Sequence, residues 1–458
     1  MLAQSLVRSW TAMNLGRTTS TSGRRRWAVA SVLVTFAAIT AYAFVAGIHL
    51  DDTNTDAKLG AAPFVGRWHW RFGRRSAIAI GVAFIGVIVL PWLVNRARLW
   101  LTVAASTFFA ILFGWSLAIV DGWSSVIAPI IDPNEYWVGV KRARPFHYFL
   151  SSYLDRALYY TVHVRGHPPG MMLLLIGMKY EHLHSPWAAA GLSFVGIAST
   201  IVSVVVTVNR LSGPDVARRA APLLAFVPFA LWQVTSADAF YCGVGASAIA
   251  LASVAATSKS QTAMIISALI SGLLAALALH LTYGATTLMT IGLAVVIVGS
   301  NRRWLVPFVI GFGSVFLMFR AGGFWWPDGF RATRGHYWAG SAKFRPAWYF
   351  FGANLAVLGL AIGVPTVASF AMLPRPSRSR AVGGSQWVVL PIAASLTAVV
   401  ANLSQMSKGE VERIWLLFMP WLVIAGISLT KRTRSLRLWL ALQATAAIVL
   451  QAALVSKW

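Results

Sequence analysis

Apolar segments of roughly twenty residues recur along the whole chain, and short polar connections separate them. A helix needs about 20 apolar residues to cross about 30 Å of hydrocarbon, so this pattern predicts an all-α, polytopic transmembrane bundle of about thirteen spans. The predicted spans are residues 27–48, 77–94, 99–120, 186–208, 218–234, 239–257, 263–280, 284–300, 304–320, 348–372, 386–403, 412–429 and 435–455. No polar stretch between them is long enough for a soluble domain, so residues 27–455 are expected to form one membrane domain.

A further apolar segment, residues 170–180, is too short for a span and is expected to be re-entrant or interfacial. With the basic residues 1–26 in the cytoplasm, alternation of the spans places most basic connections on the cytoplasmic side, in agreement with the positive-inside rule. Three long loops then lie outside, at residues 121–169, 321–347 and 404–411. One basic cluster falls on the external side against the rule, at Arg67, Arg71, Arg74 and Arg75.

Composition supports a membrane protein. Of the 458 residues, 57% are hydrophobic and 11% are charged, whereas about 25% of an average soluble domain is charged. The net charge is +26, but the basic residues are spread over many connections, which argues against nucleic-acid binding. Cys242 is the single cysteine, so an intramolecular disulfide and a cysteine-based zinc site are excluded. Abundant Ala, Gly, Arg and Trp are typical of a bacterial protein, which predicts the bacterial plasma membrane.

The acidic residues are few, and this topology sorts them to one side. Asp215 is placed in the cytoplasm, and Glu181 is ambiguous. The other eleven of the thirteen acids fall outside: Asp51, Asp52, Asp56, Asp121, Asp132, Glu135, Asp155, Asp238, Asp328, Glu410 and Glu412. Because ionisable groups are costly near a bilayer, this distribution predicts a functional site on the external face.

The loop 121–169 is the most informative external segment. It begins with Asp121, continues with DPNEYW at 132–137, and ends in VHVRGHPPG at 162–170, which contains Arg165 and His167. The Pro-Pro pair fixes an extended entry into the next segment. Between the two motifs, basic residues alternate with aromatic and aliphatic ones, which is typical of short helices lying in the membrane interface. These basic residues are Lys141, Arg142, Arg144 and Arg156.

The other two external loops add aromatic and charged groups. Arg331, Arg334 and His336 lie among four tryptophan and tyrosine residues in the loop 321–347. Such a combination can stack on a sugar ring and hold an anion, although an aromatic belt at the bilayer interface is the alternative. Glu412 and Arg413 lie at the start of a predicted span, and Asp238 precedes another. Asp238 is equally well explained as a helix-capping residue.

Two of these motifs resemble a known family. DPNEYW, followed 34 residues after its aspartate by GHPPG, resembles the acidic loop and the His/Lys-Pro-Pro-Leu turn of the GT-C membrane glycosyltransferases. That family includes protein mannosyltransferases and lipid A aminoarabinose transferases. Asp238 and the segment 409–421 resemble later family positions more weakly. The sequence departs from the family pattern, because the acidic loop follows the third predicted span and because Gly170 replaces leucine.

The resemblance implies a GT-C-like fold and a glycosyltransferase that uses a polyprenyl-phosphate sugar on the external face, with an envelope glycan, lipid or protein as acceptor. Transfer to a hydroxyl needs a carboxylate base and cations that stabilise the departing phosphate. Asp132 is the first choice for the base, with Glu135 and Asp121 as alternatives. The expected donor- and acceptor-binding residues are Arg165, His167, Tyr136, Asp238, Arg331, Arg334, His336, Glu412 and Arg413.

No cofactor is required by these residues, and a divalent cation held by Asp132, Glu135 and Asp238 remains an alternative. The chain has neither the glycine-rich dinucleotide motif nor the phosphate-binding loop of nucleotide-dependent enzymes, and its His and acidic residues do not show the spacing of a catalytic zinc helix. A transporter or flippase of a lipid-linked or anionic solute is the second functional hypothesis. It would place ionisable groups near mid-bilayer in paired repeats. A scaffold subunit is the third hypothesis, and it leaves the acidic loop unexplained.

Overall fold

The protein is predominantly helical, and 78% of it is in helices. The computed structural model describes residues 2–456 apart from 144, 184, 235, 300 and 376–383, and the side chains of residues 2–22, 141, 142 and 341 are also outside the description. The predicted all-α fold is confirmed. Of the basic residues noted in the loop 121–169, Arg144 and the side chains of Lys141 and Arg142 lie outside the described part.

The α-helices are α1 (Leu2–Thr53), α2 (Ser76–Arg96), α3 (Leu99–Ala118), α4 (Tyr136–Arg142), α5 (Phe146–Ser151), α6 (Val162–Gly166), α7 (Gly170–Tyr180), α8 (Pro186–Ser212), α9 (Pro214–Ala220), α10 (Ala230–Gln233), α11 (Ala237–Thr257), α12 (Gln261–Leu281), α13 (Met289–Val298), α14 (Leu305–Ala321), α15 (Trp326–Ala339), α16 (Ala347–Ile362), α17 (Val364–Phe370), α18 (Val389–Ser404), α19 (Val411–Ile414), α20 (Met419–Val423) and α21 (Thr433–Ala453). The short strands are β1 (Gly60–Ala61), β2 (Phe64–Val65), β3 (Arg67–Trp68) and β4 (Leu454–Val455), and β1 pairs with β2 while β3 pairs with β4.

Eight described helices are long and apolar enough to cross a membrane, and the number rises to eleven if each bent helix pair counts as one span. The chain is therefore a multi-pass membrane protein. The bent pairs are α14 with α15, at 72°, α16 with α17, at 105°, and residues 411–417 with 419–428, at 79°. The 105° bend lies at Gly363, whose φ of 84° is in the left-handed region that glycine adopts without strain.

Two of the thirteen predicted spans match neither one of the eight long helices nor one of the three bent pairs. Residues 218–234 are divided among the end of α9, a 3₁₀ turn at Ala221–Leu224 and the single turn of α10. Pro222 and Pro228 lack the amide hydrogens that a continuous helix requires, and most of the segment is buried inside the bundle. Residues 284–300 begin as a 3₁₀ helix, Tyr283–Leu288, and only α13 follows. In both segments the apolar pattern reflects burial in protein as well as contact with lipid.

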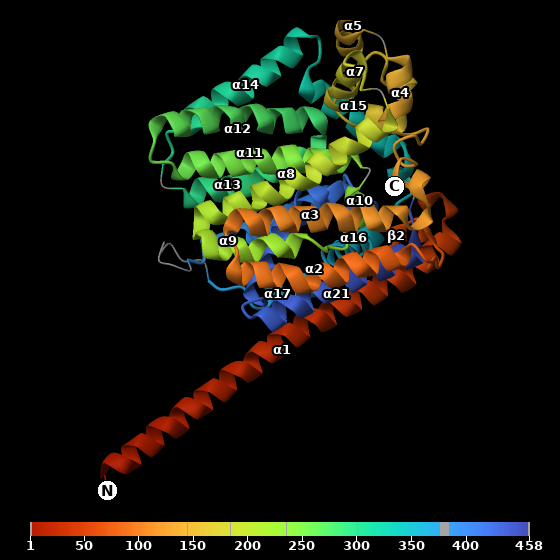
Figure 1. The fold of residues 1–458 in the computed structure, drawn as a ribbon. Helices are drawn as coiled ribbons and strands as arrows, with labels where there is room; N and C mark the ends of the chain where they lie inside the picture. Colours follow the sequence, from red (N-terminus) through yellow and green to blue (C-terminus); the bar gives the residue numbers. More distant parts are fainter. Residues whose placement is uncertain are drawn as a thin grey trace.

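Small residues allow the central helices to approach closely. Side by side in Figure 1, α8, α11, α12 and α14 form consecutive layers of the bundle. A Cβ atom on Gly196 of α8 would overlap the carbonyl of Ala239 of α11, and one on Gly311 of α14 would overlap the carbonyl of Leu269 of α12. Such close contact is typical of membrane helices, which gain stability from packing rather than from expulsion of water.

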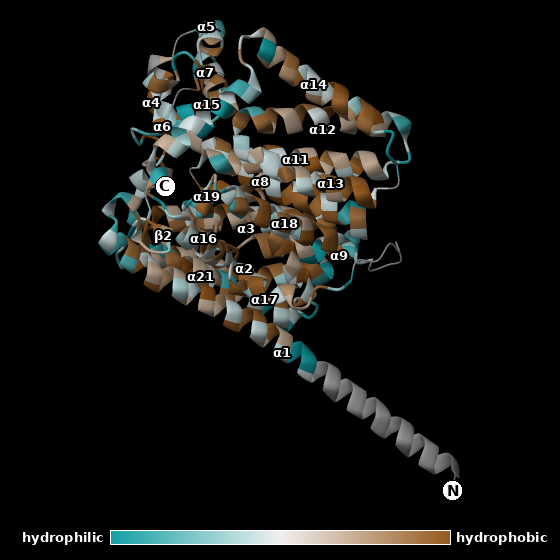
Figure 2. Cartoon of the chain, turned by 180° about the vertical axis from the view of Figure 1, so that it is seen from behind, coloured by the Kyte–Doolittle hydropathy of each residue, from teal (hydrophilic) through white to brown (hydrophobic). Residues whose placement is uncertain are grey.

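Helices α1, α2, α3, α16 and α21 lie on the other side of the molecule (Figure 1). Figure 2 shows that the long helices are mostly hydrophobic along their length, while hydrophilic residues concentrate in the connections at their ends. Large apolar side chains such as Val34, Phe84 and Leu317 are more than 60% exposed, as expected for a surface in contact with lipid.

The loop 121–169 folds into the short helices α4, α5 and α6, as its pattern predicts. It continues into α7, which has 11 residues. At 1.5 Å per residue α7 is about 16 Å long, too short to cross the bilayer. Figure 1 places α4, α5 and α7 together at one end of the long helices, and we call this end the loop face.

Candidate active site

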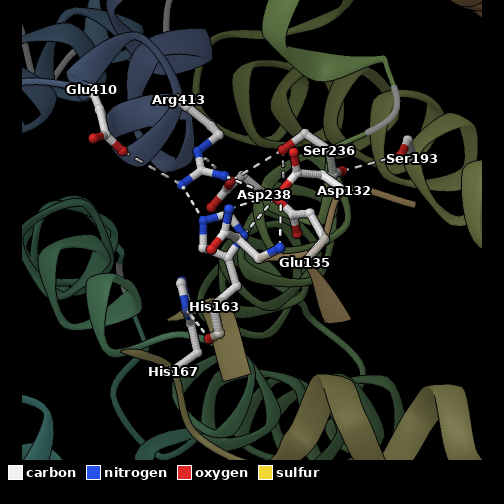
Figure 3. A network of polar contacts seen from close by, with 10 residues as sticks. Asp132, Glu135, His163, His167, Ser193, Ser236, Asp238, Glu410 and Arg413 are labelled. Carbon is white, nitrogen blue, oxygen red and sulfur yellow. Dashed lines mark hydrogen bonds and ion pairs between the residues drawn. The ribbon is translucent and has the colours of Figure 1, made fainter. Parts of the chain in front are cut away.

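Arg413 is the centre of a charged cluster at the loop face. It lies in α19, at the start of the last bent helix pair, and is only 7% exposed. Its Nη1 is 3.5 Å from Glu135 Oε1, its Nε is 3.4 Å from Asp238 Oδ2, and its Nη2 is 3.9 Å from Glu410 Oε2. Figure 3 shows the three carboxylates around the guanidinium. A largely buried arginine is thereby surrounded by acids from three separate parts of the chain.

His163 completes the cluster. Its Nδ1 is 2.5 Å from Glu135 Oε1, and its Nε2 is 3.4 Å from Arg413 Nη2. Because the guanidinium can only donate, this geometry suits a neutral imidazole in which Nδ1–H donates to Glu135 and Nε2 accepts from Arg413. Sequence reasoning missed His163. The signal was present, because His163 and His167 are four residues apart, a spacing that places two side chains on the same face of a helix.

Asp238 lies in the first turn of α11 and beside Arg413. The cap of this helix is Ser236, whose Oγ accepts a hydrogen bond from the Asp238 amide at 3.1 Å and donates one to Asp238 Oδ2. Ser193 of α8 donates to the Ser236 carbonyl and fixes the start of α11. Ser236 therefore caps α11 in place of Asp238. The Asp238 carboxylate lies between the N-terminus of this helix and the guanidinium of Arg413.

The two carboxylates of the DPNEYW motif have different surroundings. Glu135 is clamped by His163 and Arg413, whereas Asp132 Oδ1 accepts hydrogen bonds from the Asn134 amide nitrogen at 2.8 Å and from its side chain at 3.0 Å. Asp132 is partly exposed, and its carbonyl accepts a hydrogen bond from the Glu135 amide at 3.0 Å. In the same loop the Asn134 carbonyl accepts a hydrogen bond from the His163 amide, which joins the acidic motif to α6.

The His167 side chain contacts the backbone of His163 rather than the carboxylates of the cluster. Its Nδ1 donates to the His163 carbonyl at 2.9 Å, and the hydroxyl of Tyr153 donates to the His167 carbonyl at 2.6 Å. Burial lowers the pKa of His167 to about 4, although nearby Asp238 acts in the opposite direction. The imidazole is therefore neutral at physiological pH, and it holds α6 in place through its backbone contacts.

Tyr136 lies between the histidines and α11. Its ring is 6.2 Å from the His163 ring and 5.9 Å from the His167 ring, measured between centroids. Burial and the neighbouring Tyr241 raise the pKa of Tyr136, so its phenol stays protonated. A small cavity of about 30 Å³ lies against Glu135, Tyr136 and Ser193. The cluster thus adjoins a small, partly open pocket.

Other expected site residues lie apart from this cluster. Asp121 forms an ion pair with Arg71. On α15, Arg331 pairs with Asp328 at 2.7 Å and is 76% exposed in its side chain, while Arg334 is also exposed. His336 is partly buried on the same helix. Arg165 is partly buried in α6, and its carbonyl accepts a hydrogen bond from Thr333 of α15.

The segment 404–410 connects α15 and the cluster, and two residues that sequence reasoning did not select, Lys408 and Arg345, take part in this connection. Tyr337 of α15 accepts a hydrogen bond from the Lys408 amide at 2.9 Å and donates to the Gln405 carbonyl. Arg345, only 6% exposed, donates to the Lys408 carbonyl at 2.7 Å and lies 3.6 Å from Glu410. Glu412, 1% exposed, is buried next to Arg413. This segment holds Arg413 in position.

A divalent cation is not favoured by the arrangement. Where Glu135 and Asp238 approach one another, the space between them is taken by the Arg413 guanidinium. Among the described residues, no three His, Cys, Asp or Glu side chains are placed to hold a metal ion. The positive charge that neutralises these carboxylates comes from the protein's own arginine.

Comparison with known proteins finds a structural match but no sequence match. No family model and no curated protein matches the sequence. The crystal structure of ArnT from Cupriavidus metallidurans in the apo state aligns with 63% of this chain and with 56% of its own, at a TM-score of 0.40 and 14% identity. The aligned part thus spans little more than half of that protein.

Proposed function

We propose that this protein is a membrane glycosyltransferase that transfers a sugar from a polyprenyl-phosphate donor to a hydroxyl of a cell-envelope glycan, lipid or protein. The observation that carries the proposal is the buried Arg413 with Glu135, Asp238 and His163 around it, at the end of an apolar bundle. Charges within a membrane protein are costly and are retained mainly for function. We further propose that the loop face is the external face of a bacterial plasma membrane.

The position of the cluster supports an enzyme acting at the membrane surface. Asp238 and Arg413 both lie at the first turns of membrane helices, and Glu135 and His163 lie in the loop 121–169 that covers them. A lipid-linked donor presents its phosphate and its anomeric carbon at this same depth, where the head groups end and the chains begin. A transporter would instead need ionisable groups near mid-bilayer.

The transfer can be written with these groups. The acceptor hydroxyl oxygen attacks the anomeric carbon, and the bond between that carbon and the phosphate oxygen breaks. The electron pair of the breaking bond leaves with the prenyl phosphate, and the hydroxyl proton passes to a carboxylate. Arg413 is proposed to stabilise the charge that develops on the phosphate, since a preorganised guanidinium in a site of low dielectric constant does this well.

Asp132 is proposed as the general base. Glu135 already accepts from His163 and lies against Arg413, so its charge serves to position these two groups. Among the described residues, the hydrogen bonds to the Asp132 carboxylate come from Asn134 alone, so this carboxylate is not paired with Arg413 or His163. Arg165, Arg331, Arg334 and His336 remain proposed as contacts for the donor or acceptor farther from the reacting atoms.

The experiment is sugar transfer from synthetic, labelled prenyl-phosphate donors by the purified protein. Asp132→Asn is expected to reduce kcat by about a hundredfold or more, the usual contribution of a general base. Asp155→Asn is the matched control, since Asp155 is an exposed acid of the same loop, and it is expected to leave the rate unchanged. Full activity of Asp132→Asn would refute the base assignment. Solute uptake into proteoliposomes, without transfer from any donor, would favour the transporter.

A further inference from the structure

The loop face carries a second basic region, at residues 67–75, which we call the Arg–Trp segment. Arg67, Arg74 and Arg75 are exposed, and Trp70 and Phe72 between them are 64% and 56% exposed. Among the described residues, no acid lies within ion-pair distance of these three arginines. Alternating arginines and large aromatic rings are typical of a surface that lies among lipid head groups.

The Arg–Trp segment is firmly attached to the bundle. Strand β3 pairs with β4, with Arg67 opposite Val455 and Trp68 opposite Leu454. Arg71 pairs with Asp121 and donates to the Gln451 carbonyl at the end of α21, at 2.9 Å. Arg71 therefore has a structural role, and the three exposed arginines are presented from a fixed backbone. This anchoring explains how a basic cluster is held on the side that the positive-inside rule disfavours.

An apolar cavity lies directly next to this segment. It has a volume of about 730 Å³ and is lined by residues of α1, α16, α17 and α21 together with Pro63, Phe64 and Trp68. Its size is typical of a ligand site, for which 300–1,000 Å³ is a usual range. Ala37, Ala41 and Phe44 of α1 line it and are themselves exposed. The cavity therefore opens beside α1 toward the surrounding lipid.

We propose that this cavity holds one chain of an anionic phospholipid of the bilayer, with its phosphate at the exposed arginines of the Arg–Trp segment. Trp68 joins the two halves of the site, because it lines the cavity and belongs to the Arg–Trp segment. The apolar lining matches an acyl chain, and the unopposed positive charge next to it matches a phosphate. The lipid would fill the space between α1 and the rest of the bundle.

This site is distinct from the Arg413 cluster, and it does not rest on the proposed transferase activity. Phe64 lines the cavity and stacks on Trp232 at 5.7 Å, while Val65 packs against Gly409 next to Glu410. The β1–β2 hairpin thus lies between the cavity and the segment that positions Arg413. Because this hairpin separates the cavity from the Arg413 cluster, a lipid chain in the cavity is better assigned to a bilayer phospholipid than to the prenyl-phosphate donor.

The test is native mass spectrometry of the full-length protein, delipidated in mild detergent and titrated with phosphatidylglycerol or phosphatidylethanolamine. One phosphatidylglycerol is expected to bind in preference to phosphatidylethanolamine. The triple variant R67A/R74A/R75A should lose about fivefold in affinity for each arginine removed, the usual effect of one basic residue at an anionic membrane surface. The exposed pair R302A/R303A is the matched control for charge and should bind as the wild type does.

Binding of the acyl chain in the cavity is tested with Ala37→Phe, which fills the cavity. The control is Ala38→Phe, which places the same ring at a neighbouring exposed position outside the cavity. Only Ala37→Phe should weaken phosphatidylglycerol binding. Equal binding of both phospholipids, or wild-type binding by the triple variant, would overturn the proposal. It would also be overturned if inorganic phosphate bound as tightly, or if a prenyl phosphate displaced phosphatidylglycerol at equal concentration.

Discussion

Arg413 illustrates how a single side chain can organise several distant segments. Its guanidinium lies against Glu135 from the loop 121–169, Asp238 from α11 and Glu410 from its own segment. A lysine has one compact ammonium and cannot contact all three together. The planar shape of arginine is therefore as important here as its charge.

Arg413→Lys is accordingly expected to reduce sugar transfer by about a hundredfold to a thousandfold, as loss of one preorganised donor to a developing anion does. The measurement is kcat with labelled prenyl-phosphate donor, together with the melting temperature in detergent. Because the lysine keeps the charge, the melting temperature should change less than it does for Arg413→Met, which leaves Glu135 and Asp238 buried without their cation. Activity of Arg413→Lys within about twofold of wild type would contradict the role of Arg413 at the phosphate.

His167 makes the stability of the protein depend on pH. Its pKa is about 4 in the folded state because of burial, whereas an exposed histidine has a pKa of about 6.5. Between these values the unfolded chain binds a proton that the folded chain does not, so the stability falls as the pH decreases from about 6.5 to 4. Thermal unfolding in detergent across this range should show a weaker dependence in His167→Asn. The exposed His147→Asn should behave as wild type, and an unchanged profile for His167→Asn would contradict the assignment.

At the scale of elements, glycine determines how closely α12 and α14 pack. Gly311 faces the backbone of α12 at the Leu269 carbonyl, while Gly313, two residues later on the same helix, has open space around it. The two positions differ in their packing but not in their local sequence setting.

Gly311→Leu is therefore expected to destabilise the protein by about 1–3 kcal/mol or more, the cost of overpacking against a rigid backbone. Gly313→Leu is the matched control and should be neutral or slightly stabilising, because leucine favours a helix more than glycine does. The comparison is made by melting temperature and by the yield of folded protein after detergent extraction. Equal destabilisation by both variants would refute the packing argument.

At the scale of the whole molecule, the arrangement of helices places residues 155 and 259 at opposite ends of the bundle. Residue 155 lies in the loop 121–169, and residue 259 lies between α11 and α12, at the far end of α11 from Asp238. The one native cysteine, Cys242, is buried, so single cysteines introduced elsewhere can be labelled selectively.

In intact cells, a membrane-impermeant maleimide should label Asp155→Cys but not Lys259→Cys, because the loop face is proposed to be external and most basic connections lie opposite it. After permeabilisation both variants should react. The reverse labelling pattern would mean that the cluster faces the cytoplasm, and the proposed use of an external donor would have to be abandoned.

The sequence by itself determined the class of fold, because apolar segments of membrane length impose helices on any chain that must satisfy its backbone hydrogen bonds in lipid. It also indicated the loop 121–169, Asp238 and Arg413, since charged residues are rare in this composition and each one stands out. The thirteen predicted spans exceed the eight to eleven candidate spans among the described residues, because an apolar run buried in protein, such as 218–234, has the same pattern as one that faces lipid.

Only the tertiary structure decided which of these residues meet. His163 joined the cluster because the short helix α6 turns it toward Glu135, while Asp121 lies apart from the cluster and pairs with Arg71. These outcomes depend on contacts between segments distant in the chain, and no local pattern encodes them. The cavity beside the Arg–Trp segment has the same origin, since α1, α16, α17 and α21 form it only when they pack together.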